Sequence, residues 1–316
     1  MSLLRRDERG QAIVLSVLAL VALLGMSALV LDVGNWFRTK RRLQATADAA
    51  VLAGAQQLPN SVSAAQAMAL DYANKNGGDV AAADITVTTT FTTNDTISVK
   101  ARKTEDGVFS KVMGIDNANI DARAKARVDS PLQAKYVAPM VVSCDHPLIK
   151  NCTGTGNPHF DADTDLPFDK DSTGAPGAFG MLNLGKDNGG SGTPGTSEEA
   201  EWILHGFNKF LPLGYYNSDP GAKFSSGGNV QAALEDRLHT VLLFPVFRTL
   251  DGNGQNARYE IIGWIGFYLT GYDIHGNEAT LQGHFTEYIA QGILSSTGPG
   301  PSGTAGFGVK SIQLIG

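Results

Sequence analysis

The run from Ala12 to Leu31 limits most strongly what this chain can fold into, because its 20 residues include no charged side chain. As an α-helix, this run would be about 30 Å long, which matches the hydrocarbon core of a bilayer. A single segment in that core must satisfy its backbone hydrogen bonds internally, so a helix is the only solution. The sequence therefore predicts one membrane-spanning helix near the N-terminus.

A cleaved secretory signal is the alternative for this segment. Its apolar region would be unusually long, and no small-residue cleavage site follows it. The chain continues instead through Asp32 into Trp36 and Phe37, which suit the membrane interface, and then into four basic residues between positions 38 and 42, which suit lipid headgroups. This order favours a retained helix.

The orientation of the helix does not follow from charge alone. Lys and Arg residues are favoured on the cytosolic side of a membrane helix. Three basic residues precede the apolar run and four follow it, so their distribution slightly opposes a cytosolic N-terminus. Cys144 and Cys152, the only cysteines, lie in one loop and predict a disulfide outside the cytosol. We therefore expect residues 1–11 in the cytosol and the C-terminal region outside it.

The rest of the chain predicts an α+β protein whose C-terminal part is rich in strands. We expect a transmembrane and extended helix over residues 12–58, a small α+β domain over 59–130 and a β-rich domain over 131–316. Of the 37 glycines, 29 follow residue 150, which is typical of turn-rich β-structure. The net charge is −6 and no long basic tract is present, so a nucleic-acid partner is not indicated.

Hydrophobic periodicity places the main elements of both domains. Thr196 and Glu199 have the spacing of a capping box at the start of one helix. The expected helices are Ser61–Asn76, Thr196–Leu211 and Asn229–Leu238, and the expected strands are Ile85–Phe91, Thr96–Arg102, Asn119–Val128, Val137–Val142, Thr240–Arg248, Arg258–Tyr272, Glu278–Ile289 and Val309–Ile315.

Small residues line the predicted helix both inside and beyond the bilayer. Gly25 and Ala28 would let a second helix approach closely within the membrane. Further on, Leu43, Ala47 and Ala50 recur at helical spacing and form a narrow face. The ordinary explanation for that face is packing onto residues 59–130, and the functional alternative is contact with a partner helix in an assembly.

Residues 9–58 carry a joint sequence pattern around the apolar run. The pattern reads Arg9-Gly10-Gln11-Ala12, Asp32-x-Gly34, Arg41-Arg42-Leu43-Gln44 and Ala47-Asp48-Ala49-Ala50-x-Leu52-Ala53-x-Ala55. Apolar length alone would not predict the blocks around Leu43-Gln44 and Ala47–Ala50. This pattern resembles the N-terminal segment of TadE/TadG-like proteins, which act in the assembly of tight-adherence (Flp-type) pili, and the likeness continues more weakly to about residue 130.

The resemblance implies a single-pass protein of the bacterial cell membrane with a structural or scaffolding part in pilus biogenesis. The implied partners are other pilus-assembly or pilin-like proteins, and a homo-oligomer is compatible with it. Together with the small-residue face, it selects one set of candidate partner-binding residues: Gly25, Ala28, Asp32, Leu43, Gln44, Ala47, Asp48 and Ala50.

Two features depart from the family. Pilin-type members carry a glutamate five residues after the processed glycine, whereas Leu15 stands at that distance from Gly10. Larger TadG-like members contain a von Willebrand A-type domain with an Asp-x-Ser-x-Ser metal site, and this chain lacks that motif. Neither processing at Gly10 nor metal-dependent adhesion therefore follows from the resemblance.

Three alternating aspartates, Asp161, Asp163 and Asp165, are the metal candidate of the chain. An EF-hand is excluded, because Leu166 and Ser172 occupy the positions that require Gly and a bidentate Glu. A looser calcium site stays open beside the simpler alternative of a solvated acidic loop.

Zinc held by Cys144, Cys152 and the nearby His146 and His159 is less favoured than the disulfide, given an extracytoplasmic loop. No phosphate-binding loop, zinc-protease motif or nucleophile elbow occurs, so the sequence predicts neither an enzyme nor a cofactor. The alternative function is a membrane-anchored envelope enzyme or ligand-binding protein, with calcium as one candidate ligand and its site within residues 131–316.

Overall fold

The computed structural model describes residues 9–153, 156, 158–171, 173–187, 192–221, 223–296, 298 and 307–315. The chain divides into two compact units, Met1–Arg127 with Leu314–Gly316 (the N-terminal unit) and Val128–Gln313 (the C-terminal unit). A long helix, few further helices and several sheets confirm the predicted α+β class. Of the expected cytosolic segment 1–11, residues 1–8 lie outside the described residues.

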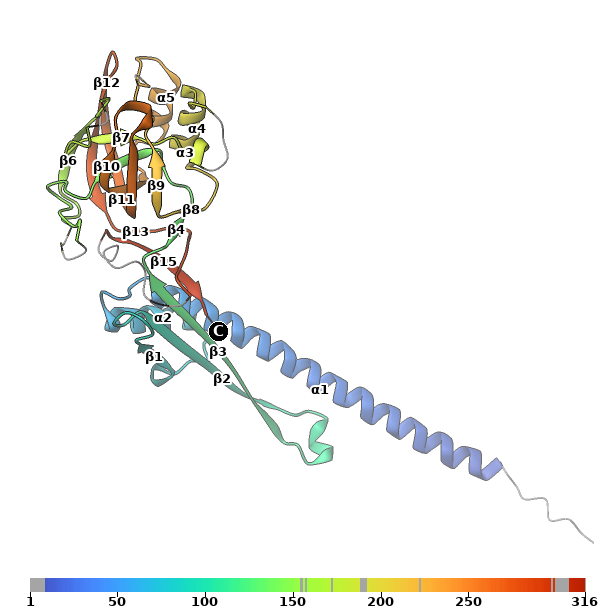
Figure 1. Cartoon of the computed structure of the whole chain (residues 1–316). Helices are drawn as coiled ribbons and strands as arrows, with labels where there is room; N and C mark the ends of the chain where they lie inside the picture. Colours follow the sequence, from blue (N-terminus) through green and yellow to red (C-terminus); the bar gives the residue numbers. More distant parts are fainter. Residues whose placement is uncertain are drawn as a thin grey trace, which may run out of the picture. The chain divides into compact units, whose positions relative to one another are not determined.

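One 47-residue helix, α1 (Arg9–Ala55), begins the N-terminal unit (Figure 1). Within the described residues it is the one helix long and apolar enough to cross a membrane. The large apolar side chains of its first half, from Ile13 to Leu31, are exposed, as lipid contact requires. Its last turns are instead covered by the rest of the unit, so the two halves of α1 face different surroundings.

The remainder of the N-terminal unit is a helix and three antiparallel strands, β1 to β3 of a five-stranded sheet, packed on α1. Strand order is β1-β2-β3, and β2 and β3 pair without interruption from Thr96–Arg127 to Asp106–Asn117. Alternate residues of the hairpin are small and buried, which lets the sheet lie close to the helix. The elements are α2 (Val62–Lys75), η1 (Ala82–Asp84), β1 (Ile85–Thr88), β2 (Thr96–Asp106), η2 (Ser110–Met113) and β3 (Asn117–Asp129).

Gly54 shows how tightly this unit is packed. A Cβ atom at Gly54 would lie 2.6 Å from Ile97 Cδ1 and 2.7 Å from the Ala65 carbonyl oxygen. Distances this short are not tolerated between real atoms, so α1, α2 and β2 can meet only because residue 54 has no side chain.

The C-terminal unit is built on a seven-stranded mixed sheet in the order β6-β12-β11-β10-β5-β7, with β9 also paired to β11. Five buried phenylalanines, Phe179, Phe224, Phe244, Phe267 and Phe285, fill its core. The strands of this sheet are β5 (Met140–Ser143), β6 (Asp163–Pro167), β7 (Phe179–Met181), β9 (Gly214–Asn217), β10 (Val241–Asp251), β11 (Arg258–His275) and β12 (Glu278–Thr286).

Short elements complete the C-terminal unit. A second small sheet has the order β14-β4-β8, and β13 pairs in parallel with β15. The elements are β4 (Gln133–Ala134), α3 (Leu184–Asp187), α4 (Thr196–His205), β8 (Leu211–Pro212), α5 (Asn229–Asp236), η3 (Gly254–Asn256), β13 (Tyr288–Ile289), β14 (Gly292–Ile293) and β15 (Val309–Leu314).

Helix α4 begins at Thr196, as predicted, but differs from its prediction in its N-terminal cap and in its last residue. Its N-cap is Gly195 rather than Thr196, and no side chain caps it, so the predicted capping box is wrong. The helix ends at His205 instead of Leu211 because Gly206 adopts a φ of 71°. A Cβ atom at Gly206 would lie 2.3 Å from the Tyr136 carbonyl oxygen, which makes glycine necessary there.

Candidate functional site: the helix–hairpin seam

Polar side chains along one face of α1 hold the β2–β3 hairpin in place. Gln44 Nε2 donates a hydrogen bond to the Arg123 carbonyl (3.1 Å), and Lys40 Nζ donates to the Asp121 carbonyl. Closer to the membrane segment, Thr39 Oγ1 donates to Glu105 Oε1 (3.1 Å). These contacts follow one another along both elements, so the hairpin runs beside α1 towards the apolar half of the helix (Figure 1). We call this contact the helix–hairpin seam.

Asp32 makes the last contact of the seam. Its buried carboxylate accepts hydrogen bonds from three consecutive backbone amides, those of Val108 (3.2 Å), Phe109 (2.8 Å) and Ser110 (2.6 Å). An anionic acceptor forms stronger bonds to N–H groups than a neutral one does. Asp32 directly follows the apolar run, so its carboxylate fixes the tip of the hairpin at the end of that run.

An open apolar groove of about 360 Å³ lies where the hairpin tip meets the apolar half of α1. A Cβ atom added at Gly25 would meet nothing within 4 Å, so the predicted small-residue surface faces open space. The groove thus combines a small-residue helix surface with an aromatic ring, the setting in which a second apolar helix can pack closely. Its lining residues are Val21, Leu24, Gly25, Ala28, Leu29, Phe109 and Ser110.

The structure separates the predicted partner-binding residues into groups with different surroundings. Leu43, Ala47 and Ala50 are completely buried within their own unit. Of the two alternatives for this face, the structure shows the ordinary one, which is packing within the unit. These three residues are therefore not exposed to a second protein in this structure. Gln44 bonds both Arg123 and Asp48 (2.9 Å), so these polar residues serve the seam.

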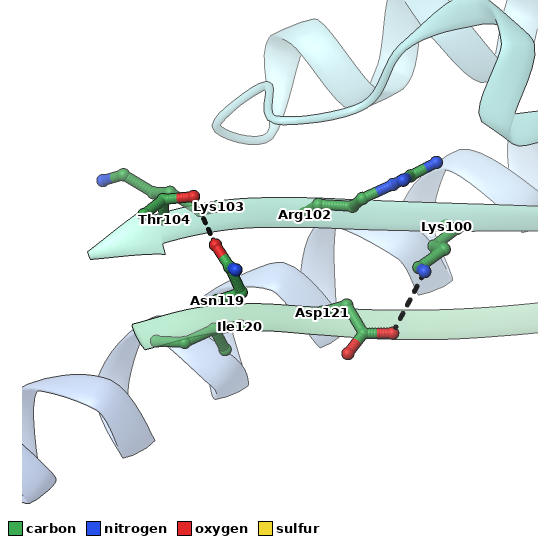
Figure 2. A pocket seen from close by; sticks show the side chains of 7 residues that line it. All are labelled: Lys100, Arg102, Lys103, Thr104, Asn119, Ile120 and Asp121. Carbon is green, nitrogen blue, oxygen red and sulfur yellow. Dashed lines mark hydrogen bonds and ion pairs between the residues drawn. The ribbon is translucent and has the colours of Figure 1, made fainter. Parts of the chain in front are cut away.

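A second groove, of about 410 Å³, lies on the outer face of the same hairpin (Figure 2). Its basic groups already have acidic partners: Lys100 Nζ lies 3.5 Å from Asp121, and Arg102 pairs with Asp84. Thr104 Oγ1 bonds Asn119 at 2.7 Å across the strands. This arrangement is a solvated strand face whose charges are balanced internally, and it presents no excess charge for an anionic ligand.

The other predicted sites lie in the C-terminal unit. Cys144 and Cys152 form a disulfide with a Cα–Cα distance of 4.9 Å. Asp161 precedes the edge strand β6, and the carboxylates of Asp163 and Asp165 are exposed on it beside an open groove of about 480 Å³. Within the part of the chain that the structure describes, these three aspartates do not form a cluster close enough to share one ion. Calcium binding therefore stays a prediction.

One buried charged cluster was not expected from the sequence. Lys223 Nζ lies 3.3 Å from Glu199 Oε1 and 3.1 Å from Asp219 Oδ2, and it donates to the Pro194 carbonyl (2.9 Å). The side chains of Glu199, Asp219 and Lys223 are 0%, 1% and 11% exposed. Burial, followed by the hydrogen bond to Asp219, raises the pKa of Glu199 to about 8. Glu199 is therefore a neutral carboxylic acid near neutral pH in the folded protein.

Comparison with known proteins identifies one segment of the chain. Residues 10–57 match the family described as "Putative Flp pilus-assembly TadE/G-like". No curated protein and no solved structure matches the chain. Residues 10–57 therefore form a TadE/G-like segment, as the sequence pattern of residues 9–58 predicts, and this segment relates the chain to Flp pilus assembly.

Proposed function

We propose that the protein is a membrane-anchored structural component of an Flp-type pilus assembly or a related envelope secretion system, and not an enzyme. The family match over residues 10–57 is the observation that carries this proposal. The same residues form the apolar helix whose first half is exposed, so the family segment and the membrane segment coincide. A pilin-like or assembly partner would then meet this protein within the bilayer.

The apolar groove beside the hairpin tip supports a contact through α1. Gly25 and Ala28 leave room for the backbone of a second helix, and van der Waals packing of this kind is a main source of helix association in lipid. The partner surface in this proposal is therefore smaller than the set predicted from the sequence. It centres on Gly25 and Ala28, because the apolar positions between 43 and 50 pack inside the unit.

Filling the groove tests the proposal. Gly25→Leu combined with Ala28→Leu keeps the span apolar, so membrane abundance should stay at the parent level while close helix approach is blocked. We expect pilus assembly to be lost and co-purification of the assembly partners from detergent-solubilised membranes to fall to background.

The matched control is Ala19→Leu with Ser27→Leu. At 100° per residue these positions lie on the opposite side of α1 from Gly25 and Ala28, and both are exposed. The control should assemble pili and retain its partners. If the Gly25/Ala28 variant behaves like this control, α1 is only an anchor and the proposal fails.

We further propose that the N-terminus is cytosolic and that the C-terminal unit lies outside the cytosol. The disulfide supports this orientation, since such bonds persist in oxidising compartments. We expect Cys144 and Cys152 to resist alkylation when cells are lysed in the presence of a thiol reagent, as measured by mass spectrometry without reduction. Two alkylated thiols in the mature protein would contradict the orientation.

A further inference from the structure

The tip of the β2–β3 hairpin carries an apolar surface that no part of the described chain covers. Val108, Phe109 and Ile115 are 69%, 43% and 45% exposed, at the end of the hairpin farthest from the buried part of the unit. Two hydrogen bonds shape the turn: Gly107 N donates to the Asp116 carbonyl (2.9 Å), and the Ser110 hydroxyl donates to the Ile115 carbonyl (3.1 Å). The tip is thus an ordered turn that presents large apolar side chains outward.

The seam places this tip at the depth of the membrane segment. Phe109 lines the groove together with Leu24 and Ala28, which lie seven and three residues before the end of the apolar run at Leu31. At 1.5 Å rise per residue, these positions are about 5–10 Å inside the run. Interfacial segments bury their apolar faces to about this depth, between the headgroups and the acyl chains.

We propose that the hairpin tip is a second membrane contact, in which Val108, Phe109 and Ile115 insert into the outer boundary of the lipid acyl chains beside α1. Val108 and Ile115 are exposed and lie outside the lining of the groove that the proposed partner helix would occupy, so at that level these two side chains face lipid. This inference rests on α1 spanning the membrane and adds a function for residues 107–116.

Polar residues around the tip agree with an interfacial position. Lys111, exposed in η2, has a side chain long enough to reach back to the headgroups while the turn is inserted. Asp106 and Asp116 flank the turn where it joins the strands and are exposed, so the charged surface resumes at its base. Two contacts with the bilayer would restrict the tilt of the N-terminal unit relative to the membrane more than a single helix does.

Site-directed spin labelling of the full chain in vesicles of phosphatidylcholine and phosphatidylglycerol tests the proposal. The sequence has no cysteine besides the disulfide pair, so Val108→Cys gives a single labelling site. We expect the label at position 108 to be several-fold more accessible to oxygen than to a water-soluble nickel complex, as it is in lipid.

Two further labels make the result decisive. Thr104→Cys lies in β2, two residues before the strand ends at Asp106 and therefore farther from the tip, and its label should be open to the nickel complex. Val17→Cys reports whether α1 is in the bilayer. Nickel access at 108 equal to that at 104, with 17 protected, would overturn the inference and leave the anchor intact. Protection at 108 from both reagents would overturn it in favour of a protein contact.

Discussion

Replacing Lys223 by Met should destabilise the C-terminal unit by about 3–5 kcal/mol, the usual result of removing one partner from a buried ion cluster. The side chains of Glu199 and Asp219 are almost completely buried, and Lys223 is the cation within 3.3 Å of both. Without it, the two carboxyl groups face each other with no compensating charge. Thermal or denaturant unfolding of the full chain in detergent measures the change.

Lys170→Met is the matched control for this variant. Lys170 forms an exposed ion pair with Glu278 at 3.5 Å, and such pairs contribute only about 0–1 kcal/mol. Adding Glu199→Gln to Lys223→Met should recover part of the lost stability, because it removes one of the unpaired acids. If Lys223→Met unfolds no more readily than Lys170→Met, the cluster does not stabilise the unit.

The same cluster sets the direction of a pH dependence. The pKa of Glu199 is raised from 4.5 to about 8 in the folded protein, so the folded state keeps a proton that the unfolded state loses. The stabilisation is complete below about pH 4.5 and is lost as the pH rises towards 8. Glu199→Gln, which cannot ionise, should flatten this part of the stability profile. An unchanged slope would show that Glu199 does not carry the proton.

Periodic elements could be predicted from the sequence because the spacing of apolar residues along the chain shows which positions are buried. The 20-residue apolar run predicted the exposed apolar half of α1, and the alternation of alanines after Asn119 predicted β3, where Ala122, Ala124 and Ala126 are buried. Helices α2 and α5 and the long strands β10 and β11 also formed close to their expected bounds. In the helices and in β3 one hydrophobic face decides the structure, whereas β10 and β11 contain apolar runs that are buried on both faces.

Contacts between distant residues could not be predicted in the same way. Asp32 binds backbone amides 76 to 78 residues away, and amides carry no side-chain signature. An acidic residue in the first turn of a helix is favoured by the helix dipole, so the position of Glu199 in the sequence gave no reason to expect a buried side chain. The spacing of Asp219 and Lys223 was the one signal of the cluster, but this pair lies outside a helix, where a separation of four has no particular meaning.

Replacing Asp32 by Ala should release the hairpin tip from α1. The amides of Val108, Phe109 and Ser110 would lose their common acceptor, and no helix or strand of the unit offers them another. In the parent chain reconstituted in lipid nanodiscs these three amides should exchange hydrogen slowly. In the Asp32→Ala variant they should exchange at rates close to those of an unfolded peptide, whereas protection of the strand Asn117–Asp129 should persist, because Lys40 and Gln44 still bond its carbonyls.

Asp106→Ala provides the control, because Asp106 is an exposed acid on the same hairpin. It should leave the protection of the three amides unchanged, so any effect of Asp32→Ala can be assigned to the carboxylate at the end of the apolar run. Asp32→Asn should fall between the two, since its amide keeps one acceptor oxygen but loses the charge that strengthens these bonds. Slow exchange retained in Asp32→Ala would mean that the tip is held by Phe109 and the apolar groove alone. The seam would then depend on packing within the membrane rather than on the buried carboxylate at its edge.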